Sequence, residues 1–297
     1  MRAGFYTALG TPLDDNGDFV VASFHMHVED QVGAGASGLL VMGSMGQQAS
    51  VKNSEFVKIA RTGVEAAKGR SPVFAGVMDN SFSRVMERIR GLEGLKLDGV
   101  VATMPYYFKL NQSEALRFFT ATAQASPFPV YLYDLPSVTQ TRIEPATLLE
   151  LMKVPNIAGI KTNDLNLSRM LQKAHLPPAA PADGDFQLMF SGLDVFDIAY
   201  GYGITKQLDG MFACTAPLTK RLYAALSSAH REEAAQILND IVRLRDQLVA
   251  VGVFPGFSHA MNLLGFKGNF APDYAGVLDA QAKEAVRACM QQIGLID

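Results

Sequence analysis

The chain has 297 residues, 48% of them hydrophobic, with 26 Lys and Arg residues against 29 Asp and Glu residues. This length can bury a sizeable core, and a net charge of −3 gives a nucleic-acid partner no electrostatic support. The two cysteines, Cys214 and Cys289, match no metal-ligand spacing, and no apolar run approaches the roughly 18 residues of a membrane span. Because the N-terminus also lacks the apolar region of a signal peptide, the sequence predicts a soluble, cytoplasmic protein that binds neither nucleic acid nor membrane.

Short apolar runs recur along the chain, and helix-like stretches separate them. Successive runs lie about 30 residues apart, which is the length of one βα unit. Regular alternation of this kind predicts a parallel sheet whose strands are covered on both faces. The predicted strands are Gly4–Leu9, Gly38–Met42, Val73–Val77, Gly99–Thr103, Val130–Tyr133, Ile157–Lys161, Gln187–Phe190 and Leu208–Phe212.

Helix start signals lie between these runs. Asn53-Ser54-Glu55 precedes the amphipathic stretch Phe56–Ala67, and Asn111 precedes the stretch Ala115–Gln124. Pro145 stands where proline is favoured in the first turn of a helix. The proline-rich stretch 177–181 precedes the seventh strand, and we expect it to be a stiff surface loop.

The number of βα units predicts the fold. Eight units account for residues 1–228, slightly short of the usual ~250 of a (β/α)8 barrel. A doubly wound open sheet would also alternate, but the even spacing and the lack of a Gly-x-Gly-x-x-Gly motif after the first strand favour the barrel. Residues 229–297 carry helical patterns at Glu232–Val251 and Ala280–Ile293, with Pro255 between them. We therefore expect an α/β protein, a (β/α)8 TIM barrel with a C-terminal helical appendage.

A lysine closes the sixth predicted strand, at the end of the barrel where active sites lie. Burial of Lys161 would disfavour its ammonium form, and a neutral lysine amine can form a Schiff base with a carbonyl substrate. The alternative is a lysine that simply extends past the strand end into solvent. Tyr133 ends the preceding strand, so it would lie beside Lys161 and could transfer protons, although aromatic side chains are also common in strand cores.

Other segments could border the same site. The second strand ends in Gly43-Ser44-Met45-Gly46, whose backbone N–H groups could bind a carboxylate, unless the segment is a plain tight turn. Tyr106 and Tyr107 follow the fourth strand and would lie near the rim, where ordinary packing also explains them. His25 and His27 imitate a metal-binding pair. Because residues two apart on a helix do not face each other, we predict no metal site there.

In order and spacing, these segments resemble the dihydrodipicolinate synthase/N-acetylneuraminate lyase family of class I aldolases. Each motif is short, but the resemblance runs over almost the whole chain. The motifs that carry it are Ala8–Leu13, Gly43–Gly46, Pro105–Tyr107, Tyr133–Pro136, Gly159–Lys161 and Ser191–Asp194.

The resemblance implies a lyase that forms or cleaves a carbon–carbon bond next to pyruvate. It implies that Lys161 forms the imine with a 2-keto acid without a further cofactor, and that Tyr133 relays protons with Ser44 and with Tyr107 of the partner subunit. It also implies a homotetramer whose partners are small 2-keto acids and aldehydes. The predicted substrate-binding residues are Ser44, Met45, Val138, Thr139, Gly192, Asp194 and Phe212.

Several positions depart from the family pattern. Met45 replaces a second hydroxyl residue, and Gln47 replaces the usual glutamate. Val138 stands where true dihydrodipicolinate synthases carry an arginine that pairs with the carboxylate of the aldehyde substrate. Phe212 and Pro217 also differ from the synthase pattern, and we expect them to narrow the mouth of the site differently.

These departures favour a 2-keto-3-deoxy sugar acid or a related 2-keto acid as substrate. Asp194 could accept hydrogen bonds from sugar hydroxyls, or it could instead cap the next helix. Dihydrodipicolinate synthase activity stays an alternative, because Arg142 could replace the missing arginine. A catalytically silent keto-acid-binding protein is a further alternative, suggested by Met45.

Overall fold

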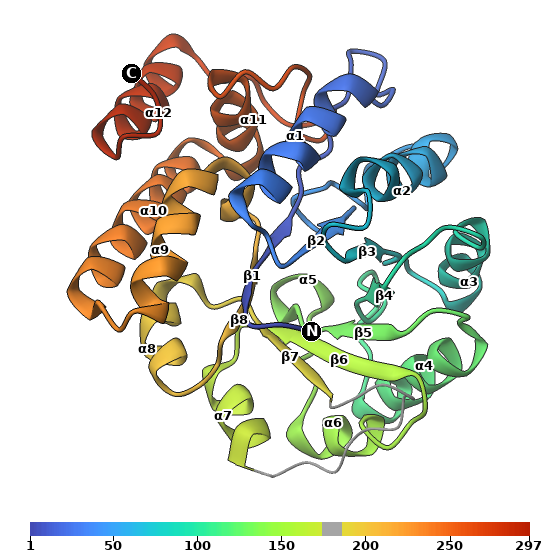
Figure 1. The fold of residues 1–297 in the computed structure, drawn as a ribbon. Coiled ribbons are helices and arrows are strands. Elements are labelled where there is room, and N and C mark those ends of the chain that lie inside the picture. Colours follow the sequence, from blue (N-terminus) through green and yellow to red (C-terminus); the bar gives the residue numbers. More distant parts are fainter. Residues whose placement is uncertain (174–185) are drawn as a thin grey trace.

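A computed structural model describes residues 1–173 and 186–297, so the predicted loop at 177–181 lies outside the described residues. Eight parallel strands pair in chain order and close into a barrel, with helices outside them (Figure 1). The predicted (β/α)8 barrel is therefore confirmed. Its strands are β1 (Gly4–Ala8), β2 (Gly38–Val41), β3 (Val73–Gly76), β4 (Gly99–Ala102), β5 (Val130–Tyr133), β6 (Ile157–Thr162), β7 (Gln187–Phe190) and β8 (Lys206–Asp209).

The last strand differs most from its prediction. β8 covers Lys206–Asp209, whereas the sequence placed it at Leu208–Phe212. β8 contains polar residues and therefore gives no clear apolar run in the sequence. The apolar run on which the prediction rested continues into the 3-10 helix η2 (Met211–Cys214). Phe212 in η2 packs edge-on against Phe5 outside the barrel, with 5.9 Å between the ring centroids. The apolar character of this run therefore reflects packing between η2 and the barrel wall.

The predicted start signals begin helices. Asn111 caps α4 in a capping box: its side chain accepts the N–H of Glu114, whose carboxylate accepts the N–H of Asn111. Pro145 is the first residue of α6. The helices of the barrel are α1 (Val21–Ala34), α2 (Asn53–Ala67), α3 (Phe82–Gly91), α4 (Gln112–Ala125), α5 (Pro136–Thr139), α6 (Pro145–Leu151), α7 (Leu165–Lys173), η1 (Leu193–Val195), α8 (Phe196–Gly201) and α9 (Ala216–Ser227).

The segment after α9 forms three helices, α10 (Arg231–Val251), α11 (Val253–Leu263) and α12 (Ala280–Gln292). The sequence predicted two, Glu232–Val251 and Ala280–Ile293, with Pro255 between them. Pro255 instead lies in the first turn of α11, where its missing N–H removes no hydrogen bond of the helix. In Figure 1 these helices cover one side of the barrel, and α10 packs against α9, α8 and η1.

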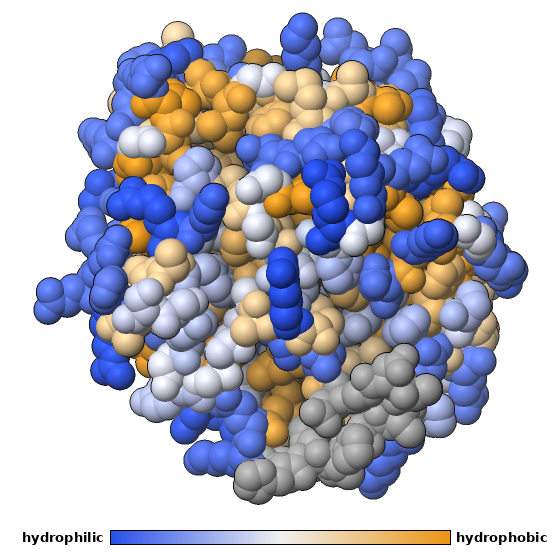
Figure 2. Space-filling model, viewed as in Figure 1, coloured by the Kyte–Doolittle hydropathy of each residue, from blue (hydrophilic) through white to orange (hydrophobic). Residues whose placement is uncertain are grey.

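The hydrophobic core has two parts. A small cluster fills the inside of the barrel, with Tyr6, Leu40 and Phe74 among its members. A larger cluster lies between the strands and the outer helices and continues into α10 and α12. Hydrophilic side chains predominate around the periphery of the face seen in Figure 2. Among the described helices, none combines the length and the apolar character of a membrane span.

His27 is a buried ionisable residue between α1 and the C-terminal segment. His25 is exposed while His27 is fully buried, so the two lie on different faces of α1. The His27 ring packs against Phe266, with 5.1 Å between centroids, and neither ring nitrogen has a hydrogen-bond partner among the described residues. Desolvation lowers the pKa of His27 to about 3, so the imidazole is neutral in the folded protein.

This burial makes the stability depend on pH. In the unfolded chain His27 protonates near pH 6.5, whereas the folded protein takes up that proton only near pH 3. The unfolded state thus binds the extra proton, and lowering the pH from 7 to 5 should cost about 2 kcal/mol of unfolding free energy through this group. Chemical denaturation at the two pH values measures the loss. His27→Phe should reduce the loss, and His25→Gln should preserve it; equal losses in wild type and His27→Phe would contradict this expectation.

Candidate active site

A cavity of about 360 Å³ opens at the carboxyl ends of the strands. Its walls come from the ends of β1, β5, β6 and β8, from the segments after β2 and β7, and from α10 and α11. Side chains with reactive or polar groups reach its wall from several of these elements, among them Ser44, Tyr133, Lys161, Asp194, Asp209 and Arg245. This is the end of the barrel at which enzymes of this fold act.

Lys161 and Tyr133 form the centre of the cavity. They are register partners on the adjacent strands β6 and β5, as the spacing of the two residues predicted. Lys161 is 6% exposed and Tyr133 is 5% exposed, and Lys161 Nζ lies 3.9 Å from the centroid of the Tyr133 ring. Among the described residues, neither Nζ nor the phenol oxygen has a hydrogen-bond or ion-pair partner. An amine and a phenol are thus side by side and available to a substrate.

Asp134 fixes these two groups relative to each other. Its N–H donates to the carbonyl oxygen of Lys161 over 2.9 Å. Its buried carboxylate accepts the Thr162 hydroxyl over 3.1 Å and the Ile143 N–H over 3.0 Å. Burial raises the pKa of Asp134, and these hydrogen bonds oppose the rise. The residue joins the ends of β5 and β6, a role that the sequence did not reveal.

The segment after β2 presents unpaired backbone donors. Ser44 and Met45 line the cavity, and their N–H groups donate no hydrogen bond within residues 1–173 and 186–297. The Thr11 hydroxyl donates to the carbonyl of Gly46 over 2.7 Å, and the Gln47 amide donates to the carbonyl of Thr11 over 3.1 Å. These bonds hold the turn in place. Two successive free N–H groups can bind a carboxylate.

Two charged residues that the sequence did not suggest also line the cavity. Asp209 ends β8 and accepts the N–H of Met211 over 2.8 Å. Desolvation raises the pKa of Asp209, and the charge of Lys161 opposes that rise. Arg245 reaches the cavity from α10 and binds the carboxylate of Asp194 through both terminal nitrogens. Asp194 therefore binds α10 and makes no side-chain cap on α8, which leaves its predicted capping alternative unsupported.

The structure does not bring every predicted residue into this cavity. Ser44, Met45, Tyr133, Lys161, Gly192 and Asp194 line it. Tyr107 is 73% exposed beyond β4, with its ring against Phe108. Val138 is exposed on α5, and the Thr139 hydroxyl donates to backbone carbonyls in a buried turn. Phe212 packs against Phe5 outside the barrel and does not line the cavity, whereas we expected it to narrow the mouth of the site.

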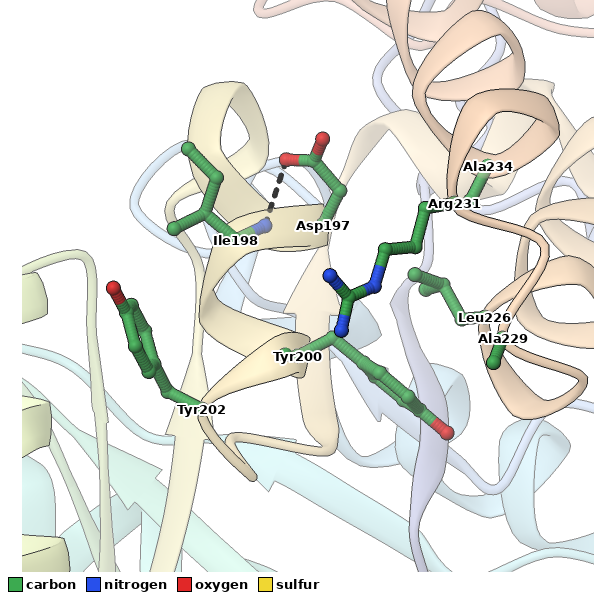
Figure 3. A pocket seen from close by; sticks show the side chains of 9 residues that line it. Asp197, Ile198, Tyr200, Tyr202, Leu226, Ala229, Arg231 and Ala234 are labelled. Carbon is green, nitrogen blue, oxygen red and sulfur yellow. Dashed lines mark hydrogen bonds between the residues drawn. The ribbon is translucent and has the colours of Figure 1, made fainter.

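A second cavity lies away from the strand ends. It has a volume of about 530 Å³ and lies between α8, the end of α9 and the start of α10. Figure 3 shows the Arg231 guanidinium between the side chains of Asp197 and Tyr200. The Asp197 carboxylate accepts the N–H of Ile198 over 2.8 Å. None of the described residues that line this cavity is a lysine, so this cavity offers no amine that could form a Schiff base.

Among the described residues, no three His, Cys, Asp or Glu side chains converge as ligands for a metal ion. The arrangement at the strand ends instead combines a buried amine, an adjacent phenol and free backbone N–H groups. These are the parts needed to bind a keto acid by its carboxylate and to attack its carbonyl.

Comparisons with known proteins find relatives that match along almost the whole chain. The model of the dihydrodipicolinate synthetase family matches residues 1–293. A 4-hydroxy-tetrahydrodipicolinate synthase from Acidiphilium cryptum (strain JF-5) is 29% identical over 300 residues, which cover 100% of this chain and 100% of that protein.

Solved structures share the fold. A prophage protein of the dihydrodipicolinic acid synthase family from E. coli K12, in complex with pyruvate, superposes with a TM-score of 0.88 at 22% identity and covers 99% of both chains. A monomeric dihydrodipicolinate synthase variant has a TM-score of 0.88 at 22% identity and covers 99% of this chain and 97% of its own. At these identities the structural likeness concerns the fold alone.

Proposed function

Because the chain belongs to the dihydrodipicolinate synthetase family, and is thereby a lyase of the class I aldolase type, we propose that Lys161 forms an imine with pyruvate or a related 2-keto acid. The observation that carries the proposal is the pair of register partners at the strand ends, with Lys161 Nζ 3.9 Å from the centroid of the Tyr133 ring. Both groups are buried and have no polar partner among the described residues.

The chemistry follows from these groups. The neutral amine of Lys161 attacks the keto carbon, and the carbonyl oxygen leaves as water after it has taken up protons. In the protonated imine, the nitrogen accepts the electron pair of the bond between C3 and C4, so that an aldehyde leaves and an enamine remains. Tyr133 gives a proton to the departing keto oxygen during imine formation and takes up the proton of the C4 hydroxyl as the C3–C4 bond breaks. The enamine then takes up a proton at C3, and water hydrolyses the resulting imine to release pyruvate and the free Lys161 amine. The N–H groups of Ser44 and Met45 hold the carboxylate, and the Ser44 hydroxyl assists the proton transfer.

We propose that the substrate is a 2-keto-3-deoxy sugar acid or a related 2-keto acid. Two observations argue against a second carboxylate on the substrate. Val138 is apolar and lies outside the cavity wall, and Arg142, which could have replaced the missing arginine, forms an ion pair with Asp164 and does not line the cavity. In contrast, the carboxyl groups of Asp194 and Asp209 in the cavity wall can form hydrogen bonds with sugar hydroxyls.

A comparison of substrates tests this proposal. The loss of one charged hydrogen bond typically costs about 1.5–3 kcal/mol, or roughly 10- to 150-fold. We therefore expect kcat/KM for cleavage of 2-keto-3-deoxy sugar acids to exceed that for condensation of pyruvate with aspartate semialdehyde. A preference for the semialdehyde would favour the synthase alternative and leave the imine intact. Stoichiometric keto-acid binding with no turnover of either class would favour a silent binding protein.

We also propose a cytoplasmic homotetramer in which Tyr107 of the partner subunit completes the proton relay. In support, Tyr107 and Phe108 are 73% and 75% exposed and their rings lie edge to face, which places two large aromatic groups at the surface. Contiguous exposed aromatic groups are typical of protein–protein contacts.

A further inference from the structure

Arg245 is a basic side chain of the cavity wall besides Lys161. Its Nε, Nη1 and Nη2 all donate hydrogen bonds to carboxylates. Its Nη1 and Nη2 donate to the two carboxylate oxygens of Asp194 over 2.9 and 2.5 Å. Its Nε donates to the carboxylate of Asp246 over 2.6 Å. The side chain of Arg245 is 28% exposed, against 60% for Asp194 and 65% for Asp246. A helix outside the barrel thereby fixes a carboxylate at the mouth of the cavity.

This contact determines what Asp194 can offer a substrate. The guanidinium lowers the pKa of Asp194, so the group is a carboxylate at neutral pH. Each of its oxygens accepts one N–H from Arg245, and a carboxylate has about four acceptor positions. Acceptor capacity therefore remains for substrate hydroxyls. The bidentate contact also fixes the orientation of the carboxylate plane.

The charges around the mouth favour an uncharged substrate end. Among the described residues that line the cavity, the basic ones are Lys161 and Arg245. The first would carry the imine, whose positive charge balances the carboxylate of the keto acid itself. The positive charge of Arg245 is exceeded by the two negative charges of Asp194 and Asp246, with which it forms ion pairs. A carboxylate at the far end of a substrate would thus have to displace Asp194 or lie against it, and like charges in contact are costly.

We propose that Arg245 is a positioning residue that holds Asp194 as a charge filter at the cavity mouth. The filter accepts 2-keto-3-deoxy acids whose far end is a neutral hydroxyl and rejects those whose far end is a carboxylate. The inference rests on the proposed function for the identity of the reacting end, but it concerns the opposite end of the substrate.

The test compares two ligands of equal chain length, a 2-keto-3-deoxy aldonate and the corresponding 2-keto-3-deoxy aldarate, which differ only in a terminal CH2OH or carboxylate. Calorimetric titration gives both dissociation constants without requiring turnover. Wild type should bind the aldonate at least about tenfold more tightly. Asp194→Asn removes the opposing charge and frees Arg245, so it should shift the ratio of the constants about tenfold or more toward the aldarate.

Variants of the arginine separate positioning from folding. Arg245→Gln should weaken aldonate binding and shift the ratio away from the aldarate, because it removes the cation and releases Asp194. Arg245→Lys, which keeps the charge but cannot form the bidentate contact, should restore part of the discrimination. Asp246→Asn is the matched control. Asp246 binds the same guanidinium but does not line the cavity, so the ratio should change by less than about threefold, within the range of a surface ion pair.

An unchanged ratio in Asp194→Asn, or a wild type that binds the aldarate as tightly as the aldonate, overturns the charge filter. Failure to bind either ligand does so as well. The proposed function is tested separately by borohydride trapping of pyruvate on the same proteins. Trapping that fails while the ratio shifts as expected contradicts the imine and leaves the filter standing. Trapping that succeeds while the ratio of the dissociation constants stays unchanged in Asp194→Asn supports the imine and contradicts the charge filter.

Discussion

Lys161→Arg should abolish turnover and leave the fold intact. Arginine keeps a positive charge at this position, but its guanidinium stays protonated and cannot attack a carbonyl. The side chain lies at the strand end beside an open cavity, which gives the longer arginine room. Incubation with pyruvate and borohydride, followed by peptide mass spectrometry, should place the reduced adduct on Lys161 in the wild type and nowhere in the variant. Activity should fall to the background without enzyme.

A matched control separates this effect from a general loss of lysine. Lys153 is exposed, forms an ion pair with Glu150 on the surface and does not line the strand-end cavity. Lys153→Arg should keep both activity and trapping, and thermal unfolding of Lys161→Arg should resemble that of the wild type. Adducts formed only on other lysines, or turnover by Lys161→Arg, would remove Lys161 from the mechanism.

Much of the fold follows from the sequence because buried parallel strands give clear apolar runs. The pairing of Tyr133 with Lys161 was predictable for the same reason, since the ends of successive strands are neighbours in a barrel. Asp209 shows where this reasoning fails. It ends β8, and the rule that active-site residues follow strand ends would have identified it. The strand was placed two residues late because its own residues are polar and the apolar residues beyond it pack outside the barrel.

Arg245 could not have been predicted in this way. It lies on α10, and helical periodicity indicates which face of a helix is buried but not which loop of the barrel that face covers. The contact of α10 with η1 depends on tertiary packing alone. The resemblance predicted Val138, Thr139 and Phe212 as substrate-binding residues, and none of the three lines the cavity. A motif transfers residue positions without the local packing that decides whether a side chain faces the cavity. The catalytic roles of Lys161, Tyr133, Ser44 and Tyr107 stay predictions.

Tyr133→Phe should slow turnover on the order of 10²-fold or more, as expected for the loss of a positioned general acid–base group. Phenylalanine keeps the ring against Lys161 Nζ, so the packing in the barrel is preserved while the phenol is lost. The effect should be larger on kcat than on trapping of the pyruvate imine, because cleavage requires proton transfer to and from the substrate hydroxyl as well. Steady-state kinetics and borohydride trapping on the same preparation measure the two effects.

The same substitution two residues earlier on β5 provides the control. Tyr131 lies on the same strand inside the barrel, edge-on to Phe74 with 5.1 Å between centroids, and does not line the cavity. Burial raises the pKa of Tyr131 to about 12, so its phenol stays protonated and unreactive at neutral pH. Tyr131→Phe should therefore leave kcat within about threefold of the wild type, because it removes no group from the reaction path.

If Tyr133→Phe and Tyr131→Phe both kept full activity, the proton relay would have to use another group. Ser44, the one hydroxyl residue of the turn after β2 that lines the cavity, and Tyr107 would then be the groups to replace next.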